Sequence, residues 1–323
     1  MSLVRDEMAE QPAVLSRLLR DSAGALAAAA AEIEARGPRY AVIAARGSSD
    51  NAARYAQHLF GRFWGMPVAL ATPSLHTLYD ARVDYRDAVV IGISQSGASP
   101  DVASVIAAAS GQGAVTIAIT NQPDSALGSA ARHVIELRTG PERSVAATKT
   151  YTASLGAVAA LVRGVDALAG VPEAMARQLA VDVPVEAAAG WPRLAVVGRG
   201  ANYGTAFEAA LKLEELTGLI AAPWSSADFL HGPIAMVEPG FPILAIAPPG
   251  PTLAGMRELL AAAAERGAEL TVIGDGIPLE PVEEWLTPLV SVIPAQLLAV
   301  GAAERLGRDV DRPSGLRKVT LTS

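Results

Sequence analysis

Short hydroxyl and amide side chains are concentrated in one loop of this chain, residues 94–99, SQSGAS (the SQSGAS loop). The apolar run at residues 88–93 predicts a buried strand before it, and residues 102–109 predict a helix after it. Phosphate is bound at such junctions by hydroxyl groups and by backbone amides at the helix N-terminus. A helix cap would need only Ser99. The richer loop predicts a phosphate site made by Ser94, Gln95, Ser96 and Ser99.

A second pair of serines, Ser48 and Ser49, follows the apolar run at residues 40–45. The loops after neighbouring strands of a doubly wound sheet converge on one crevice, so these serines could complete the phosphate site. Alternatively, one of them caps the helix that begins near Asp50. The segment at residues 198–204, GRGANYG, is one residue too long for a dinucleotide-binding GxGxxG motif. We interpret it as a duplicated strand-to-helix turn.

Candidate acid–base groups lie in the second half of the chain, on an amphipathic helix predicted for residues 205–216. Glu208 and Lys212 are spaced i and i+4, which by default predicts a solvated ion pair. Glu214 and Glu215 cannot both lie on one face of the helix. One of these two carboxylates should therefore point toward the sheet or a cleft.

His231 stands before a Gly-Pro turn and is either structural or catalytic. Proline and glycine interrupt residues 308–321, which predicts either a frayed tail or a docked segment. If Leu316 and Val319 dock the segment, Arg317 and Lys318 are left to meet an anion. The histidines show no metal-ligand spacing, so no metal site is expected; they are at positions 58, 76, 133 and 231.

The elements that must position these groups form two similar halves. After helices over residues 5–20 and 22–36, predicted strands alternate with helical stretches, which is typical of parallel sheets with right-handed crossovers. The predicted strands are at residues 40–45, 67–71, 88–93, 114–119 and 133–136, and then at 193–197, 241–247, 269–273 and 289–292. Helices around residues 147–168 and 172–188 are expected to bridge the two halves.

The second half begins as an internal duplication, because YAVIAARGSSD at residues 40–50 resembles LAVVGRGANY at residues 194–203. In this alignment the SQSGAS loop falls opposite residues 247–252, APPGPT. The prolines remove amide donors and most of the hydroxyl groups are missing. We therefore expect one composite site, with the phosphate held by the first half and the chemistry supplied by the second.

Composition narrows the classes of function. The 323 residues suffice for two domains, and 51% of them are apolar. The net charge of −7 and the lack of a Lys/Arg block argue against nucleic-acid and membrane-surface partners. Without cysteine there is no thiolate nucleophile and no disulfide. No signal-peptide core is found at the start, and no apolar run approaches the length of a membrane span, so we expect a soluble cytoplasmic protein.

Together, the order and spacing of the motifs resemble the SIS (sugar isomerase) domain family from about Tyr40 onward. The motifs are RGSSD at 46–50, SQSGAS at 94–99, GPERSVAATKT at 140–150, EAALKLEE at 208–215, HGP at 231–233, and DVDRP at 309–313 with Lys318. The chain resembles in particular the isomerase half of glucosamine-6-phosphate synthase and stand-alone deaminases of amino-sugar phosphates. The resemblance implies an α/β fold with two tandem doubly wound parallel-sheet SIS domains. The expected organisation is N-terminal helices at 1–37, SIS domains at 38–168 and 190–306, a linking helix at 169–189, and a tail that closes the site at 307–323.

The resemblance also implies roles for individual residues. Those expected to bind the sugar phosphate are Ser49, Ser94, Gln95, Ser96 and Ser99, and further substrate contacts are expected from Gly47, Ser48, Val145 and Arg317. Glu215 would move a proton between sugar carbons C1 and C2, and His231 would assist ring opening. Lys212 would lie near the sugar, and Lys318 would engage the open-chain ketose. In the family the histidine comes from a partner subunit, which implies a homodimer with shared active sites, and neither cofactor nor metal is expected.

Differences from the synthase refine the expected activity. The chain has neither the glutaminase domain nor its cysteine, so it is not expected to draw ammonia from glutamine. Ala147, Asp228 and Ser314 stand where the synthase has serine, glutamate and arginine. The expected reaction converts glucosamine 6-phosphate to fructose 6-phosphate and ammonia by ring opening, 1,2-proton transfer and imine hydrolysis. The alternatives are a phosphosugar aldose–ketose isomerase, a deglycase of an amine-linked sugar phosphate, and a non-catalytic sugar-phosphate-binding regulator.

Overall fold

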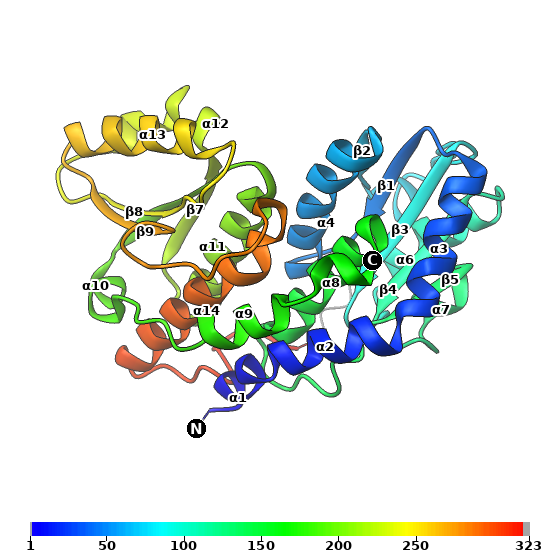
Figure 1. Ribbon diagram of the computed structural model, residues 1–323, viewed down its shortest axis with the longest axis horizontal. Helices are drawn as coiled ribbons and strands as arrows, with labels where there is room; N and C mark the ends of the chain where they lie inside the picture. The colour runs from blue at the N-terminus through cyan, green and yellow to red at the C-terminus, as the bar shows by residue number, and fades with distance from the viewer. Residues whose placement is uncertain (1, 319–323) are drawn as a thin grey trace. The chain divides into compact units, whose positions relative to one another are not determined.

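A computed structural model describes residues 2–318, which form two compact units, each built around one parallel sheet (Figure 1). Of the described residues, the β1–β5 unit comprises Glu10–Glu142, Lys149–Pro172 and 317–318. The β6–β9 unit comprises residues 2–9, Arg143–Thr148 and Glu173–Leu316. Each unit therefore contains short segments that are distant in sequence from its sheet.

The sheet of the β1–β5 unit has the strand order β2-β1-β3-β4-β5, and all its pairings are parallel. The strands are β1 (Tyr40–Ala44), β2 (Val68–Leu70), β3 (Ala88–Ser94), β4 (Val115–Thr120) and β5 (His133–Glu136), which confirms the five predicted strands of the first half. Every residue of β3 is buried, as expected for a central parallel strand. The order reverses between β1 and β3, so the loops after these two strands lie at a topological switch point, where ligands bind in such sheets.

Helices cover both faces of this sheet. On one face lie α3 (Ala23–Arg36), α4 (Ser48–Leu59) and α8 (Lys149–Arg163), and on the other α5 (Ser74–Thr77), α6 (Pro100–Ser110) and α7 (Ala126–Ala130). The helix α2 (Gln11–Asp21) packs on α8, a π-helical turn at Phe60–Trp64 continues α4, and a 3-10 turn at Val165–Leu168 follows α8. All but the last residue of α8 is buried, so this helix forms part of the core.

The sheet of the β6–β9 unit has the order β7-β6-β8-β9, again with parallel pairings. Its strands are β6 (Arg193–Gly198), β7 (Ile220–Ser225), β8 (Pro242–Ile246) and β9 (Glu269–Ile273). This order repeats β2-β1-β3-β4, so β6 corresponds to β1 and β8 to β3, as the predicted duplication requires. The first glycine after the leading strand has a positive φ in both sheets, 55° at Gly47 and 61° at Gly200.

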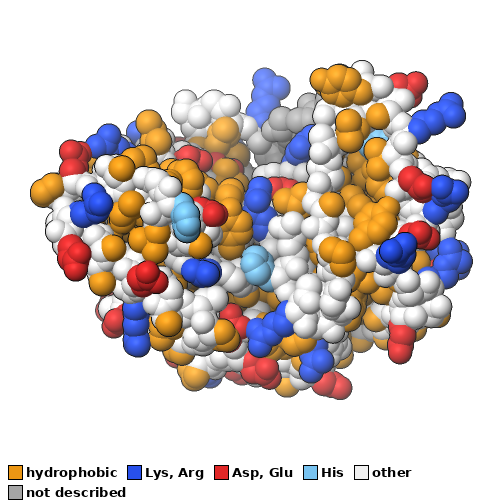
Figure 2. Space-filling view, turned by 90° about the horizontal axis from the view of Figure 1, so that it is seen from above, with side chains coloured by type: hydrophobic (Ala, Val, Ile, Leu, Met, Phe, Trp, Pro, Cys, Tyr) orange, Lys and Arg blue, Asp and Glu red, His pale blue; other side chains and the backbone are white. Residues whose placement is uncertain are grey.

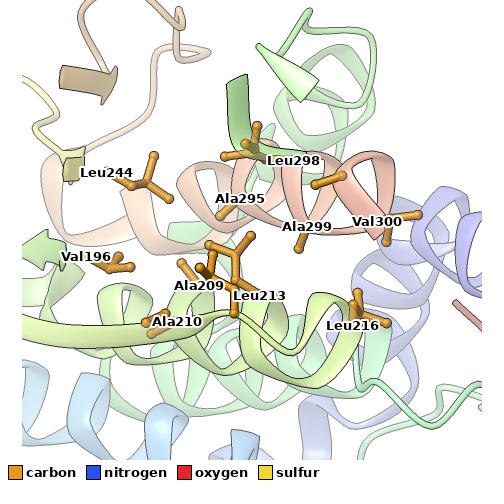
Figure 3. Close-up of a cluster of buried hydrophobic side chains, with 14 of the residues drawn as sticks. Val196, Ala209, Ala210, Leu213, Leu216, Leu244, Ala295, Leu298, Ala299 and Val300 are labelled. Atoms are coloured by element: carbon orange, nitrogen blue, oxygen red, sulfur yellow. The ribbon is translucent and has the colours of Figure 1, made fainter. Parts of the chain in front are cut away.

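The core of the β6–β9 unit follows the alternation of β6. Leu194 and Val196 belong to the cluster formed with α11 (Tyr203–Thr217) and α14 (Thr287–Arg305), whereas Ala195 and Val197 belong to the cluster on the opposite face, where α12 (Ser226–Leu230) and α13 (Leu253–Glu265) lie. Figure 3 shows α11 side chains such as Leu213 facing α14 side chains such as Leu298. The remaining elements of the chain are α1 (Leu3–Ala9), α9 (Val171–Gln178), α10 (Val185–Gly190) and 3-10 turns at Gly200–Asn202, Pro233–Met236 and Glu284–Leu286.

Three predictions about secondary structure were wrong. Residues 289–292 are not a strand but lie inside α14, which has a proline in its first turn, where the missing amide costs no hydrogen bond. The strand β7 was not predicted. The helices predicted for residues 5–20 and 172–188 are each two helices, α1 with α2 and α9 with α10.

The sequence interpretation found no apolar run that approaches the length of a membrane span, and the run around α14 shows that this was wrong. Glu284–Arg305 is long and apolar enough to cross a membrane, but 94% of its most apolar stretch is buried inside the protein. This burial is what a core helix shows. On the face seen in Figure 2, acidic and basic side chains of the described residues are interspersed rather than gathered into a patch of one sign.

Candidate functional site

The SQSGAS loop keeps hydrogen-bond donors available. Ser94 Oγ accepts a hydrogen bond from the Gly97 amide (3.2 Å), and Ser96 Oγ accepts one from the Ala98 amide (3.3 Å). Each hydroxyl group therefore retains its own proton for donation to a ligand. Ser99 is the residue before α6, yet its side chain makes no capping hydrogen bond. The capping interpretation of Ser99 was therefore wrong, whereas phosphate binding by the loop stays a prediction.

Two carbonyl groups anchor the SQSGAS loop to the segment after β4. The amides of Asn121 and Leu127 donate to the carbonyls of Gln95 (3.2 Å) and Gly97 (3.1 Å). Gly97 has a φ of +59°, and a Cβ at this position would lie 1.9 Å from Ser125 Oγ. Only glycine fits this close approach. These two carbonyls are therefore occupied within the protein, and the loop is held in one conformation against the segment after β4.

The turn after β1 is fastened to the helix after the SQSGAS loop. Arg46 Nε donates to the carboxylate of Asp101 (2.9 Å), which is buried in the first turn of α6. The helix α4 begins at Ser48, two residues earlier than expected, and Gly47 precedes it with no side-chain cap. Since β1 and β3 are parallel neighbours, Ser48 and Ser49 open on the same edge of the sheet as the SQSGAS loop.

In the β6–β9 unit, the helix α11 carries a lysine between two carboxylates. Lys212 Nζ lies 3.5 Å from Glu208 Oε1 and donates a hydrogen bond to Glu215 Oε2. The Glu208 side chain is fully buried, so the expected solvated ion pair is in fact an interior one. The Glu215 side chain keeps 22% of its surface exposed. Burial raises the pKa of Glu214, with a smaller contribution from the charge of Glu215.

A cavity of about 450 Å³ adjoins Glu215. The C-terminal end of α11 lines one side, and residues 308–316 line the other. The structure thus brings Glu215 and this C-terminal segment together within one unit. A carboxylate that is held by an ammonium group and borders a cavity can accept a proton and return it to a bound molecule.

The C-terminal segment is docked, so the frayed-tail interpretation was wrong as far as Lys318. In the β6–β9 unit, the carbonyl of Asp311 accepts a hydrogen bond from the Val145 amide (3.1 Å), and its carboxylate accepts from the amides of Leu3 and Val4 (3.0 and 2.9 Å). Val319, expected to help the docking, lies outside the described residues.

In the β1–β5 unit, Lys318 Nζ donates to the buried carboxylate of Glu142 (2.9 Å). The neighbouring Arg317 is exposed. The sequence interpretation left both cations to meet an anion. For Lys318, the anion that the structure provides is a carboxylate of the protein itself.

His231 follows α12 and is exposed. Its Nδ1 lies 2.8 Å from the carbonyl oxygen of Ala227. A carbonyl only accepts hydrogen bonds, so Nδ1 carries the proton, and the neutral ring keeps a lone pair on Nε2. Within residues 2–318, the ring makes no hydrogen bond to Lys212 or Glu215. The structure therefore leaves the catalytic role of His231 a prediction.

Comparison with known proteins identifies the family. The SIS domain model matches residues 36–163 and 189–276. The chain belongs to the SIS domain family. It is 35% identical over 299 residues to the glutamine–fructose-6-phosphate aminotransferase (isomerizing) of Methanothermobacter thermautotrophicus, covering 84% of this chain and 50% of the relative. The corresponding enzyme of Gloeobacter violaceus is 31% identical over 350 residues, covering 97% of this chain and 57% of the relative. The chain thus spans about half the length of these relatives.

Solved structures support the same relationship. A protein from Silicibacter pomeroyi assigned as a phosphosugar isomerase superposes with a TM-score of 0.89 at 33% identity, covering 96% of this chain and all of that one. The C-terminal domain of glucosamine-fructose-6-phosphate aminotransferase from Francisella tularensis gives a TM-score of 0.82 at 26% identity, covering 97% of this chain and 98% of that one. The SIS chain is therefore homologous to the isomerase half of these aminotransferases.

The structural roles of three polar residues near the predicted groups were not predicted from the sequence. Glu208 was interpreted only as a surface partner of Lys212. Asn121 directly follows β4, a position at the carboxyl edge of the sheet that could have drawn attention to it. Glu142 lies in an irregular Gly-Pro-Glu-Arg segment, and no sequence signal places it beside Lys318.

Proposed function

We propose that this chain is an isomerising amino-sugar-phosphate deaminase that converts glucosamine 6-phosphate and water to fructose 6-phosphate and ammonia. The observation that carries the proposal is the Lys212–Glu215 pair. A lysine that is nearly fully buried orients a partly exposed carboxylate at the edge of a cavity. This arrangement suits a reaction in which one carboxylate takes a proton from carbon and returns it to the adjacent carbon.

In the proposed reaction, the SQSGAS loop with Ser49 binds the 6-phosphate, and Gly47, Ser48, Val145 and Arg317 make further substrate contacts. Nε2 of His231 takes the proton of the O1 hydroxyl and returns it to the ring oxygen, which opens the ring. Glu215 then removes the C2 proton while O1 takes up a proton from water, which gives a planar enaminol. Glu215 delivers its proton to C1 while the amino nitrogen gives up one proton to water, which leaves a C2 imine. Water adds to the resulting C2 imine, and ammonia leaves from C2 as the C2 carbonyl forms.

Two lysines have distinct roles in this proposal. Lys212 holds the Glu215 carboxylate in place, and Lys318 meets the open-chain sugar, where an ammonium group stabilises negative charge that develops on oxygen.

The relatives support the substrate class. The names of the aminotransferases given above describe them as isomerizing enzymes that act on fructose 6-phosphate. The chain matches about half the length of the Methanothermobacter enzyme and nearly all of the C-terminal domain of the Francisella enzyme. A deaminase reaction uses the same sugars in the reverse sense. We further propose a cytoplasmic homodimer in which His231 acts on the substrate of the partner subunit. Its exposure is compatible with that role.

A second candidate is a phosphosugar aldose–ketose isomerase. It is favoured by the Silicibacter pomeroyi protein, a structural relative with a TM-score of 0.89 that matches 96% of this chain and all of that one. The two activities share ring opening and 1,2-proton transfer. They differ only in whether an amine leaves C2.

The experiment that tests the proposal incubates the purified protein with glucosamine 6-phosphate and measures ammonia and fructose 6-phosphate separately. Equal amounts of both products are expected. A folded protein that binds the sugar phosphate but releases neither product would refute the deaminase. Turnover of glucose 6-phosphate to fructose 6-phosphate, with no ammonia from the amino sugar, would favour the second candidate.

A further inference from the structure

Lys318 is held by a carboxylate that is more deeply buried than the lysine itself. The side chain of Glu142 is fully buried, whereas that of Lys318 retains 24% of its surface exposed. One carboxylate oxygen, Oε2, accepts the hydrogen bond from Lys318 Nζ at 2.9 Å. A buried carboxylate is costly unless it is paired, so this contact is a fixed feature of the β1–β5 unit.

The second oxygen of Glu142 is occupied by the main chain. Oε1 accepts a hydrogen bond from the amide of Thr150 (3.1 Å), in the first turn of the 15-residue helix α8. The N-terminus of a helix favours a negative charge, which supports the ionised carboxylate there. Glu142 is therefore fixed from one side by the helix α8 and presents its other oxygen to Lys318.

The segment that carries Glu142 is tied to the SQSGAS loop through Asn121. The main-chain amide of Asn121 donates to the main-chain carbonyl of Gln95 in the loop (3.2 Å). Its side chain accepts from the Thr139 amide (3.0 Å) and donates to the carbonyl of Gly140 (2.8 Å), two residues before Glu142. Hydrogen bonds thus run from the loop through Asn121 to the backbone next to Glu142.

We propose that Glu142 is a positioning residue that holds Lys318 at a fixed place relative to the SQSGAS loop. Its role in turnover rests on the proposed function, in which the loop binds the phosphate of the sugar and Lys318 meets the opened end. The substrate class is then an open-chain sugar phosphate whose phosphate group and reacting carbonyl lie at opposite ends of the molecule. Glu142 touches neither end and acts through Lys318.

The tether is tested without any turnover by acylating lysines with acetic anhydride and following each site by mass spectrometry. Replacement by Glu142→Gln should raise the labelling rate of Lys318 about 3-fold or more, because a charged hydrogen bond is lost. The matched control is Glu10→Gln. Lys149 is the first residue of α8, and its Nζ lies 2.5 Å from Glu10 Oε2. Glu10→Gln weakens this ion pair and should leave the labelling of Lys318 unchanged. Equal labelling of Lys318 in the wild type and in Glu142→Gln would overturn the tether.

The role in turnover is tested by a double-mutant cycle with glucosamine 6-phosphate. Glu142→Gln should lower kcat about 10-fold or more, with KM changed less than about 3-fold, because the phosphate contacts remain. In a Lys318→Met background the same replacement should lower kcat less than about 2-fold, since the residue acts only through the lysine. Glu142→Asp, which keeps the charge, should recover part of the loss.

The outcomes separate the inference from the proposed function. An equal loss of kcat in both backgrounds would mean that Glu142 is merely structural, and it would overturn the positioning role. A wild-type protein that does not turn over the amino sugar would refute the proposed function. In that case, faster labelling of Lys318 in Glu142→Gln still supports the tether, and unchanged labelling contradicts it.

Discussion

Replacing Lys212 by methionine should destabilise the β6–β9 unit strongly. The replacement removes the ammonium group but keeps a side chain of similar length, so the fully buried carboxylate of Glu208 loses its neighbouring cation at 3.5 Å. Breaking a buried pair in this way costs about 3–5 kcal/mol. Glu215 is partly exposed and can be hydrated, so we expect a value near the lower end, about 3 kcal/mol, which is roughly a 100-fold change in the unfolding equilibrium.

The assay is urea unfolding followed by tryptophan fluorescence. Three of the four tryptophans, Trp191, Trp224 and Trp285, lie in the β6–β9 unit, so the signal reports mainly on that unit. With a urea dependence of up to about 3 kcal/mol per molar, the midpoint should fall by about 1 M or more.

Lys149→Met is the matched control. Lys149 is as deeply buried as Lys212, but its partner Glu10 has 52% of its side chain exposed and can be hydrated when the lysine is lost. The control should therefore cost less than about 1 kcal/mol, as an exposed pair does. Adding Glu208→Gln to Lys212→Met should recover part of the lost stability. A loss of unfolding free energy in Lys212→Met that is no larger than the loss in Lys149→Met would contradict a stabilising interior contact between Lys212 and Glu208.

Three further predictions follow from single contacts. Gly97→Ala should abolish binding of sugar phosphate, measured by calorimetry, because its Cβ would overlap Ser125 Oγ, whereas Gly111→Ala, with nothing nearer than 3.5 Å, should bind normally. Ser99→Ala should raise KM for the sugar phosphate but leave the urea midpoint unchanged, because the Ser99 hydroxyl makes no capping hydrogen bond. A lower urea midpoint with an unchanged KM would instead show that Ser99 caps α6. Burial lowers the pKa of His76, so the unfolded chain binds this proton more readily. Stability should therefore decline as pH falls below about 6.5, and His76→Gln should reduce that decline.

The parallel strands of both sheets were largely predictable, because their apolar runs are short and separated by helical stretches. Residues 289–292 show the limit of that signal. A four-residue segment with three apolar residues is compatible with a buried strand and with one turn of a buried helix, and only the packing of α14 decides between them. The strand β7 contains Pro223, which disfavours a strand by pattern. It is tolerated because β7 lies at the edge of its sheet and pairs only with β6.

Part of the candidate site was likewise predictable from the sequence, and part of it was not. The spacing of Glu208 and Lys212 predicted their contact, since i and i+4 are neighbours on a helix, but spacing carries no information about burial. The hydroxyl groups of the SQSGAS loop were recognisable by residue type. The pairing of Glu142 with Lys318 joins positions 176 residues apart, and only the tertiary structure brings them together.

The central claim is that Glu215 carries a proton between C2 and C1 of an amino-sugar phosphate. The most direct measurement uses glucosamine 6-phosphate deuterated at C2 and examines the fructose 6-phosphate by NMR, for the wild type and for Glu215→Gln. The wild type should release ammonia and place part of the deuterium at C1, with the rest lost to water. The variant should bind the sugar phosphate with nearly unchanged affinity and turn over at least about 100-fold more slowly. Turnover by Glu215→Gln at the wild-type rate, or product without any C1 deuterium in a short single-turnover reaction, would contradict the account.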